Sequence, residues 1–214
     1  MNSLCCAGAL LLLVFVPPLL LYCVYQRKRW RHVMDRDRMT GLLNESGLME
    51  QARTLVARLP QSSDDRRADR TQFVVAYMDL DGFKKLNDTY GHDVGDKSLC
   101  IFAESLSREL RSGEDLIARA HSAGDEFIAL LVNSSTERAR AALSRVEDDY
   151  LQGLDQQSIN RAGNGVSYGC VHSREEMATL SELRAESAED ALKYLLRIAE
   201  ERMRHAKQEK GAAR

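Results

Sequence analysis

The sequence is poor in proline, and it lacks both a paired-cysteine motif and an excess of charge of one sign. Three prolines and 13 glycines in 214 residues exclude collagen-like and low-complexity chains. The five cysteines form no CxxC pair, and three of them lie in one apolar stretch, so neither a zinc site nor a disulfide framework is indicated. Thirty basic and 32 acidic side chains give a net charge of -2, which argues against a dedicated nucleic-acid-binding protein.

The rest of the composition is that of a globular chain. Hydrophobic residues make up 44% of it and charged residues 29%, which excludes a disordered or fibrous protein. A length of 214 residues allows one ordinary domain and an appendage, but not two full domains. These values are typical of an α/β or α+β domain, either an enzyme or a binding module, that faces the cytosol.

The appendage is an apolar N-terminal segment without charge. Residues 4–25 contain no charged or amide side chain, and as a helix they would extend about 33 Å, enough to cross a hydrocarbon core of about 30 Å. Residues 26–32 then form a cationic cluster, and lysine and arginine stay on the cytoplasmic side of a membrane. The sequence therefore predicts a single-pass anchor in a bacterial inner membrane, with the rest of the chain in the cytoplasm.

This interpretation divides the chain into a transmembrane anchor over 1–25, a basic juxtamembrane linker helix over 26–36, and one domain over 37–214. A cleaved signal peptide is disfavoured, because the positive charge follows the apolar run instead of preceding it. A shallow hairpin or a peripheral apolar tail stays open, since Pro17 and Pro18 should kink a helix in mid-span.

Apolar periodicity organises the domain. The second and third predicted strands are joined by a turn-rich segment, which is typical of a hairpin. The order of elements predicts an α/β (α+β) sandwich, in which helices flank a central, mainly antiparallel sheet. The predicted helices cover residues 47–59, 97–110, 135–151 and 188–207, and the predicted strands cover 73–78, 116–120, 127–132 and 165–171.

Chemistry-bearing residues gather first where the strand over 73–78 ends. Asp79 follows this buried strand directly, a position that favours a metal ligand over a structural role. The segment 79–84 also opens a short helix, whose N–H groups would attract anions, and Gly82 would let a phosphate approach the backbone closely. Asp81 lies in the same segment, and for this residue capping of the helix is the favoured interpretation.

A second acidic group lies at the hairpin turn over 122–127. Asp125 and Glu126 are adjacent and lead into an apolar strand, where successive side chains point to opposite faces. If one of them lies beside Asp79, two or three carboxylates converge, and they need a cation or a proton to coexist. Such a cluster is typical of two-metal phosphoryl-transfer chemistry.

Asn87 and Asp96 belong to a polar wall over residues 87–96. An amide and a carboxylate together can pair with the donors and acceptors of a purine edge, and a carboxylate that accepts two N–H bonds favours guanine. Asp96 could instead cap a helix that begins at Lys97. His92 is more typical of a structural loop residue than of a catalytic one.

Three blocks of the sequence resemble the GGDEF family of diguanylate cyclases, namely residues 37–44, 79–96 and 123–127. The last block reads AGDEF, a variant of the family signature. Weaker likeness follows at 165–169 and 199–207, so the resemblance extends from residue 37 to about residue 211. It implies the nucleotidyl-cyclase-like fold of that family.

The resemblance implies that two GTP molecules, each held by one subunit, are joined into cyclic di-GMP across a homodimer, with Mg²⁺ or Mn²⁺. By position, Asp79, Asp125 and the Leu80 carbonyl correspond to metal ligands. Glu126 corresponds to the acid that helps to deprotonate the attacking 3′-hydroxyl. The nucleotide-binding matches are Gly82 and Phe83 for phosphates, Asn87 and Asp96 for guanine, and Lys207 for the terminal phosphates.

The sequence also departs from the family pattern around the signature. Ala123 stands at the first signature position, which costs about 1–2 kcal/mol only if that residue needs a positive φ. Three residues separate Arg119 from Ala123 where the family has one, an insertion of two that preserves the alternation of faces but widens the turn. Glu45 follows Asn44 where the family usually has arginine.

Two further departures concern nucleotide contacts. No Gly-Arg pair follows Lys207 at the expected spacing, so one phosphate clamp is missing unless Lys210 or Arg214 replaces it. Residues 111–115 contain one residue more than the family's RxxD product-inhibition motif. The sequence therefore predicts weak or absent feedback inhibition.

Three hypotheses follow. The leading one is an active, membrane-anchored diguanylate cyclase, which the intact carboxylates favour. The alternative is a catalytically degenerate GGDEF domain that binds GTP or cyclic di-GMP or acts as a protein-interaction module, which the widened turn and the missing arginine favour. The third is another nucleotidyl cyclase on a similar sheet.

Overall fold

The computed structural model describes residues 16–18, 21–22, 34–59, 72–159 and 163–212. The chain divides into two compact units, Met1–Arg36 and Asp37–Arg214, and the second holds all the elements discussed below. Most of the predicted anchor over 1–25 and linker helix over 26–36 lies outside the described residues. In the part of the chain that is described, none of the helices has the length and apolar character that a membrane span requires.

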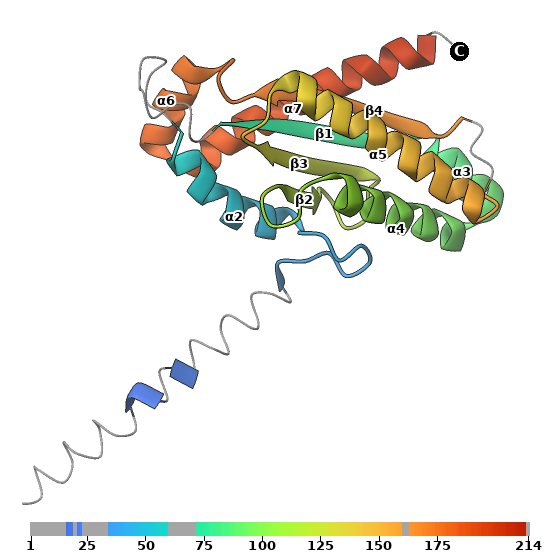
Figure 1. Cartoon of the computed structure of the whole chain (residues 1–214), viewed down its shortest axis with the longest axis horizontal. Coiled ribbons are helices and arrows are strands. Elements are labelled where there is room, and N and C mark those ends of the chain that lie inside the picture. The colour runs from blue at the N-terminus through green and yellow to red at the C-terminus, as the bar shows by residue number, and fades with distance from the viewer. Residues whose placement is uncertain (1–15, 19–20, 23–33, 60–71, 160–162, 213–214) are drawn as a thin grey trace, which may run out of the picture. The chain divides into compact units, whose positions relative to one another are not determined.

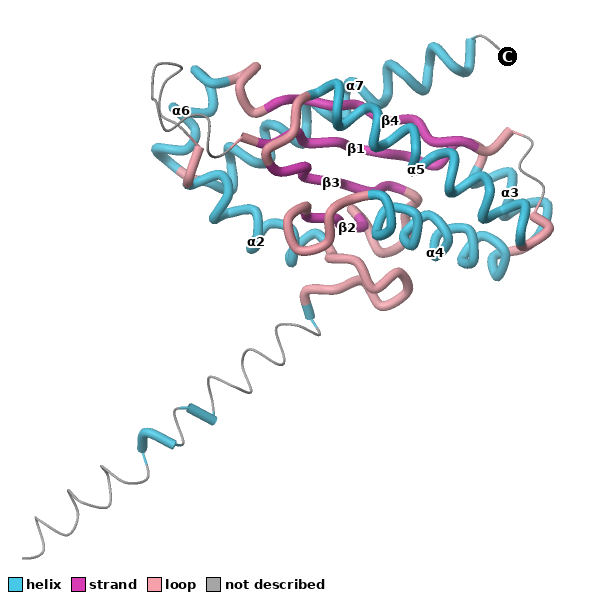
Figure 2. The backbone as a smooth tube through the Cα atoms, in the orientation of Figure 1, coloured by secondary structure: helices cyan, strands magenta, loops and turns pink. Residues whose placement is uncertain are grey.

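The second unit consists of helices on both faces of one antiparallel sheet (Figure 1, Figure 2). The strand order is β2-β3-β1-β4, and each neighbouring pair is antiparallel. The predicted sandwich of helices around a mainly antiparallel sheet is thereby confirmed. In chain order the elements are α2 (Glu45–Ala57), β1 (Phe73–Asp81), α3 (Phe83–Tyr90), α4 (His92–Glu109), β2 (Leu116–Arg119), β3 (Glu126–Val132), α5 (Thr136–Gln156), β4 (Gly165–His172), α6 (Met177–Glu186) and α7 (Ala188–Ala212).

Strand β1 is buried along its whole length, because helices cover both faces of the sheet. Its residues alternate between two cores. Val74, Ala76, Met78 and Leu80 pack with α4 and α5 on one face, whereas the odd-numbered residues from Phe73 to Tyr77 pack with α2, α6 and α7 on the other. Figure 1 shows α4 and α5 on one side of the sheet and α7 on the opposite side. This double burial explains the almost continuous apolar run in the sequence.

Two helices were predicted between β1 and β2, a short one that opens at residues 79–84 and one over 97–110. Both are present as α3 and α4, which are joined at Gly91 with a φ of +87°, and α4 begins at His92, earlier than predicted. Leu86 is the buried residue of α3, so this helix has too few apolar positions to show a helical period. Helix α6 shows no period either, since Leu180 is its buried residue, and it was not predicted. Asp96 lies inside α4, so the alternative that it caps a helix start was wrong.

The block that precedes α2 runs along the outer edge of β2. Leu43 forms a parallel bridge with Ala118, its N–H donates to the Ile117 carbonyl at 3.1 Å, and its carbonyl accepts the Arg119 N–H at 2.9 Å. The unpaired groups of this edge strand are thereby satisfied. The same contact brings Asp37 to the base of the β2–β3 turn.

The position of α7 depends on Gly169 of β4. A Cβ at this residue would lie 2.1 Å from the Ala199 carbonyl oxygen and 2.3 Å from the Met203 nitrogen. These atoms belong to the α7 backbone, which cannot give way as a flexible side chain can. Gly169 therefore allows the close approach of α7 to the sheet.

Gly169→Ala is expected to lower the free energy of unfolding by about 2 kcal/mol, because the added methyl group forces α7 off the sheet. Urea unfolding followed by circular dichroism measures the change. Gly211→Ala is the matched control, since a Cβ there would meet nothing within 4 Å and alanine favours the helix. Equal stability of Gly169→Ala and the parent protein would contradict the close packing of α7.

Candidate functional site

Carboxylates from two distant stretches of the chain meet at one end of the sheet. β1 pairs with β3 so that Asp79 lies directly opposite Glu126. One residue on, the Leu80 N–H donates to the Asp125 carbonyl at 3.3 Å. The structure thus brings the acids of both motifs together, as an insertion of two residues in the turn allows.

Glu126 is held by a tyrosine that the sequence pattern does not single out. Residues directly opposite in an antiparallel pair share a face, so Glu126 points to the same side of the sheet as Asp79 and Tyr77. The Tyr77 hydroxyl donates to Glu126 Oε2 at 2.9 Å. Burial raises the pKa of Tyr77, and the Glu126 charge raises it further, so the phenol keeps its proton. Tyr77 lies within the apolar run of β1, where nothing in the sequence separates it from core residues.

Lys207 reaches from α7 to the same cluster. Its Nζ donates to Asp79 Oδ1, while 45% of its side chain stays exposed. Burial raises the pKa of Asp79, and the charges of Asp125 and Asp81 add to the rise, which the hydrogen bond from Lys207 only partly offsets. Burial alone would lower the pKa of Lys207, but the nearby carboxylates outweigh it and raise that pKa. The lysine is therefore a stable positive charge beside the acids.

Asp125 adds a second unfavourable charge. Burial raises the pKa of Asp125, and the charge of Glu126 raises it further. The main-chain N–H of Asp125 and the charge of Lys207 act in the opposite direction. A divalent cation is complementary to two such crowded carboxylates. The carboxylates of Asp79 and Asp125 and the Leu80 carbonyl offer only oxygen donors, which Mg²⁺ prefers. Among the described residues no group of three or more His, Cys, Asp or Glu side chains is arranged to hold a metal.

Asp81 does not cap the following helix, which corrects the expectation from the sequence. The N-cap of α3 is Gly82, with a φ of +76° and no hydrogen bond from a side chain to the first turn. Asp81 instead accepts hydrogen bonds from the Ser167 hydroxyl at 2.7 Å and from Lys210 Nζ at 3.2 Å. Among the described residues, the N–H groups at the start of α3, including that of Phe83, therefore have no side-chain cap, as an anion-binding helix end requires.

The Asn87 side chain carries an orphaned acceptor. Its Oδ1 is buried and, within the described residues, has no hydrogen-bond partner. It lies against Gly95, where a Cβ would come within 1.8 Å of it. Asp96, the next residue along α4, is exposed. A buried acceptor without a partner is costly, and a ligand with N–H donors would remove that cost.

The widened turn before the signature is braced by Arg119. This side chain is only 3% exposed, and its Nε and NH2 groups donate to the Gly124 carbonyl at 3.0 and 2.8 Å. Its NH1 group lies 3.4 Å from Asp37 Oδ1, which also accepts two hydrogen bonds from Thr40. Ala123 is not among the described residues with positive φ, so alanine at the first signature position carries no backbone strain.

Two departures from the family pattern meet beside Glu126. The inserted His121 places its Nε2 atom 3.7 Å from Glu126 Oε2 and its Nδ1 atom 3.9 Å from Glu45 Oε2. The imidazole is 62% exposed. The His121 side chain thus lies between the carboxylates of Glu45 and Glu126. The contact with Glu45 is not visible in the sequence, because this residue lies in a distant segment of the chain.

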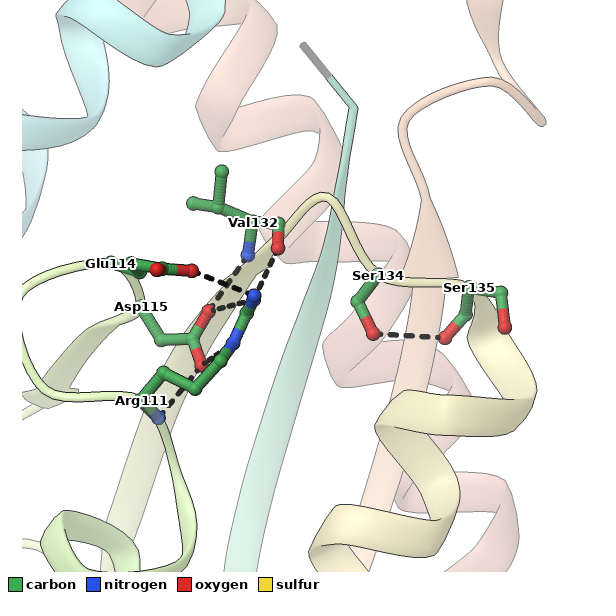
Figure 3. A network of polar contacts seen from close by, with 6 residues as sticks. All are labelled: Arg111, Glu114, Asp115, Val132, Ser134 and Ser135. Atoms are coloured by element: carbon green, nitrogen blue, oxygen red, sulfur yellow. Dashed lines mark hydrogen bonds and ion pairs between the residues drawn. The ribbon is translucent and has the colours of Figure 1, made fainter. Parts of the chain in front are cut away.

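The arginine of the altered product-inhibition motif is already engaged (Figure 3). Arg111 NH2 donates to Asp115 Oδ1 at 2.8 Å and also to the Val132 carbonyl, and its NH1 group pairs with Glu114 Oε2 at 2.7 Å. Asp115 in turn accepts the Val132 N–H at 2.9 Å. The guanidinium is therefore bound within the chain at the end of β3.

A protein-family model matches nearly the whole of the second unit. Residues 34–212 match the family described as "Diguanylate cyclase, GGDEF domain". The chain therefore belongs to the GGDEF family, and the resemblance stated from its motifs is confirmed. Among solved structures, the GGDEF domain of TpbB (YfiN) from Pseudomonas aeruginosa is similar, with a TM-score of 0.55 and 27% identity over 81% of this chain and 89% of that one.

Curated relatives agree with this family. Diguanylate cyclase DgcP from Pseudomonas aeruginosa is 40% identical over 110 residues, which are 51% of this chain and 15% of that protein. Probable diguanylate cyclase DgcT from Escherichia coli K12 is 33% identical over 119 residues, which are 56% of this chain and 24% of that protein. The chain thus spans less than a quarter of the length of either relative.

Asp125→Asn is expected to stabilise the protein in the absence of divalent cations. A pKa raised by folding means that the charged carboxylate costs stability above its folded pKa, and that the cost vanishes as the pH falls below the unfolded value. The amide carries no charge, so the gain should be about 1 kcal/mol near pH 8 and should shrink toward pH 4. Urea unfolding at both pH values measures it.

The exposed Asp148 on α5 supplies the control, because Asp148→Asn removes a carboxylate that already lies in solvent, and it should change stability little at either pH. Lower stability of Asp125→Asn at pH 8 would show that Asp125 is not electrostatically unfavourable in the folded protein.

Proposed function

We propose that the protein is a membrane-anchored diguanylate cyclase, which condenses two GTP molecules into cyclic di-GMP with Mg²⁺ across a homodimer of its GGDEF domains. The observation that carries the proposal is the position of Asp79 opposite Glu126, with the Asp125 carbonyl bound to the next residue of β1. Phosphoryl transfer needs positioning, in-line geometry and charge neutralisation more than covalent help from the protein. The acids and Lys207 lie together where helix α3 starts, and this arrangement meets these needs.

The phosphates and the cation would bind at the end of β1. Asp79, Asp125 and the Leu80 carbonyl would hold Mg²⁺, or Mn²⁺ in its place, and the cation would neutralise the phosphate oxygens. The N–H groups of Gly82 and Phe83 would cradle the phosphates, which the lack of a side-chain cap on α3 supports.

Glu126 would take up the proton of the attacking 3′-hydroxyl. The hydrogen bond from Tyr77 would fix the orientation of its carboxylate, and Tyr77 keeps its own proton because burial raises its pKa. Lys207 would turn its positive charge to the terminal phosphates. It is suited to this role because its side chain is half-exposed and its pKa is raised by the acids around it.

Guanine recognition would rest on Asn87 and Asp96. The orphaned Asn87 Oδ1 would accept an N–H of the base, and Asp96, exposed on α4, could accept two more. Each subunit would hold one GTP, so the reaction needs two domains that face each other. The engaged Arg111 supports the expectation that feedback inhibition through its motif is weak.

A catalytically degenerate GGDEF domain that binds GTP or cyclic di-GMP, or acts as an interaction module, is the second candidate. The widened turn over 120–125 favours it, because it changes the segment next to the signature acids. The missing Gly-Arg pair also favours it, since Lys210 donates to Asp81 and to the Val166 carbonyl and so is already engaged. A third candidate, another nucleotidyl cyclase, would produce a monomeric cyclic nucleotide.

Incubation of the full-length protein with GTP and Mg²⁺ should yield cyclic di-GMP, and Glu126→Gln should lower the rate at least about a hundredfold, because the base for the 3′-hydroxyl is lost. Chromatography of the products measures both. Glu104→Gln, an exposed change of the same kind on α4, should leave the rate unchanged. Bound GTP without turnover would support the degenerate domain, and a monomeric cyclic product would support the third candidate.

The apolar segment over 4–25 supports an anchor in the inner membrane, which would bring two domains together. At equal dilute concentration, the full-length protein in lipid vesicles should therefore be more active per molecule than a fragment of residues 34–214. Initial rates over a concentration series measure the difference, and the fragment should approach the full-length rate only when concentrated. Equal activity at dilute concentration would contradict a role of the anchor in dimerisation.

A further inference from the structure

Helix α7 loses its hydrophobic support before it reaches the candidate site. Met203 is the last buried residue of the helix, which continues to Ala212. Residues 204–212 are exposed, except for the partly buried Ala206. Figure 1 shows this end of α7 clear of the other helices. Lys207 lies in this part of the helix, so apolar packing does not fix its position.

Two ion pairs fasten this end of the helix to β1. Lys207 and Lys210 are three residues apart and share a face of α7. Their partners, Asp79 and Asp81, are two residues apart and share a face of β1. Lys207 Nζ contacts Asp79 Oδ1, and Lys210 Nζ lies 3.2 Å from Asp81 Oδ2. The helix end is therefore aligned along the strand by two neighbouring contacts.

Lys210 contacts acceptors from three elements of the domain. Its Nζ atom donates to the Val166 carbonyl at 2.7 Å and to Asp81, and lies 3.7 Å from Glu147 Oε1. An ammonium has three N–H donors, and these two hydrogen bonds use two of them, while Glu147 adds an ion pair at longer range. Glu147 Oε1 also accepts the Val166 N–H at 2.9 Å, and Ser167 donates to the buried Asp81. The lysine is thus held by β1, by β4 and by α5.

We propose that Lys210 is a positioning residue, which anchors the end of α7 on Asp81, Val166 and Glu147 and so keeps Lys207 beside Asp79. The inference rests on the proposed function for its effect on nucleotide binding, but the anchor itself does not. In this position Lys210 holds the helix end and does not replace the missing phosphate clamp, because Asp81 and the Val166 carbonyl already take two of its donors. Lys207 has Asp79 as its partner and is the lysine that can turn to a phosphate.

A double-mutant cycle in the full-length protein tests the proposal. Lys210→Met should weaken binding of a fluorescent GTP analogue with Mg²⁺ about fivefold in the parent protein, but less than about twofold in a Lys207→Met background, because its effect passes through Lys207. Gln208→Met places the same side chain on an exposed position of the same turn and should change nothing. The Michaelis constant for GTP should follow the same pattern as the affinity.

Hydrogen exchange of the amides in residues 204–212 provides a readout without nucleotide. Lys210→Met should raise their exchange rate at least about threefold, while the rest of the domain and its melting temperature stay nearly unchanged. Unchanged exchange would overturn the anchor. Equal losses of affinity in both backgrounds would show that Lys210 contacts the nucleotide itself, which also overturns the proposal. If the parent protein binds no GTP, the proposed function fails, and exchange still decides the anchor.

Discussion

The pairing of β1 with β3 is the constraint on which the candidate site depends. β1 carries apolar side chains into two separate cores, so a slip by one residue would exchange every side chain between the two faces. Such a slip would drive Asp79 into the core of α4 and α5 and bring Met78 to the acidic cluster. The register is therefore fixed by the hydrophobic residues, and the position of Asp79 opposite Glu126 follows from it.

The helices supply what the sheet cannot. α3 begins at Gly82 and directs uncapped N–H groups to the end of β1, and α7 brings a cation to the same place. The approach of α7 depends on Gly169, and its end is fastened along the outer edge of β4. There Lys210 binds the Val166 carbonyl, and Arg202 donates to the Cys170 carbonyl at 2.6 Å. The contacts that satisfy this edge strand thus also hold the helix that serves the site.

The sequence was sufficient to predict the elements with a strong apolar period. The four strands and the helices α2, α4, α5 and α7 were predicted because each buries a regular set of side chains, and the start of α3 was predicted from its motif. Helix α6 buries one residue and leaves no period to detect. The prediction that Asp81 caps the next helix was wrong, because it considered only residues close in sequence. The partners of Asp81, Ser167 and Lys210, lie 86 and 129 residues away. The hydrogen bond of Tyr77 to Glu126 was unpredictable for the same reason, because it joins residues 49 apart. Contacts across the sheet follow from register, and register requires the fold.

Two departures from the family pattern meet in space. The insertion that widens the turn places the His121 imidazole 3.7 Å from the Glu126 carboxylate and 3.9 Å from the carboxylate of Glu45, which stands where the family usually has arginine. Arg119 then holds the longer turn through the Gly124 carbonyl. The longer turn and the glutamate at position 45 therefore occur together with the register that places Asp79 opposite Glu126.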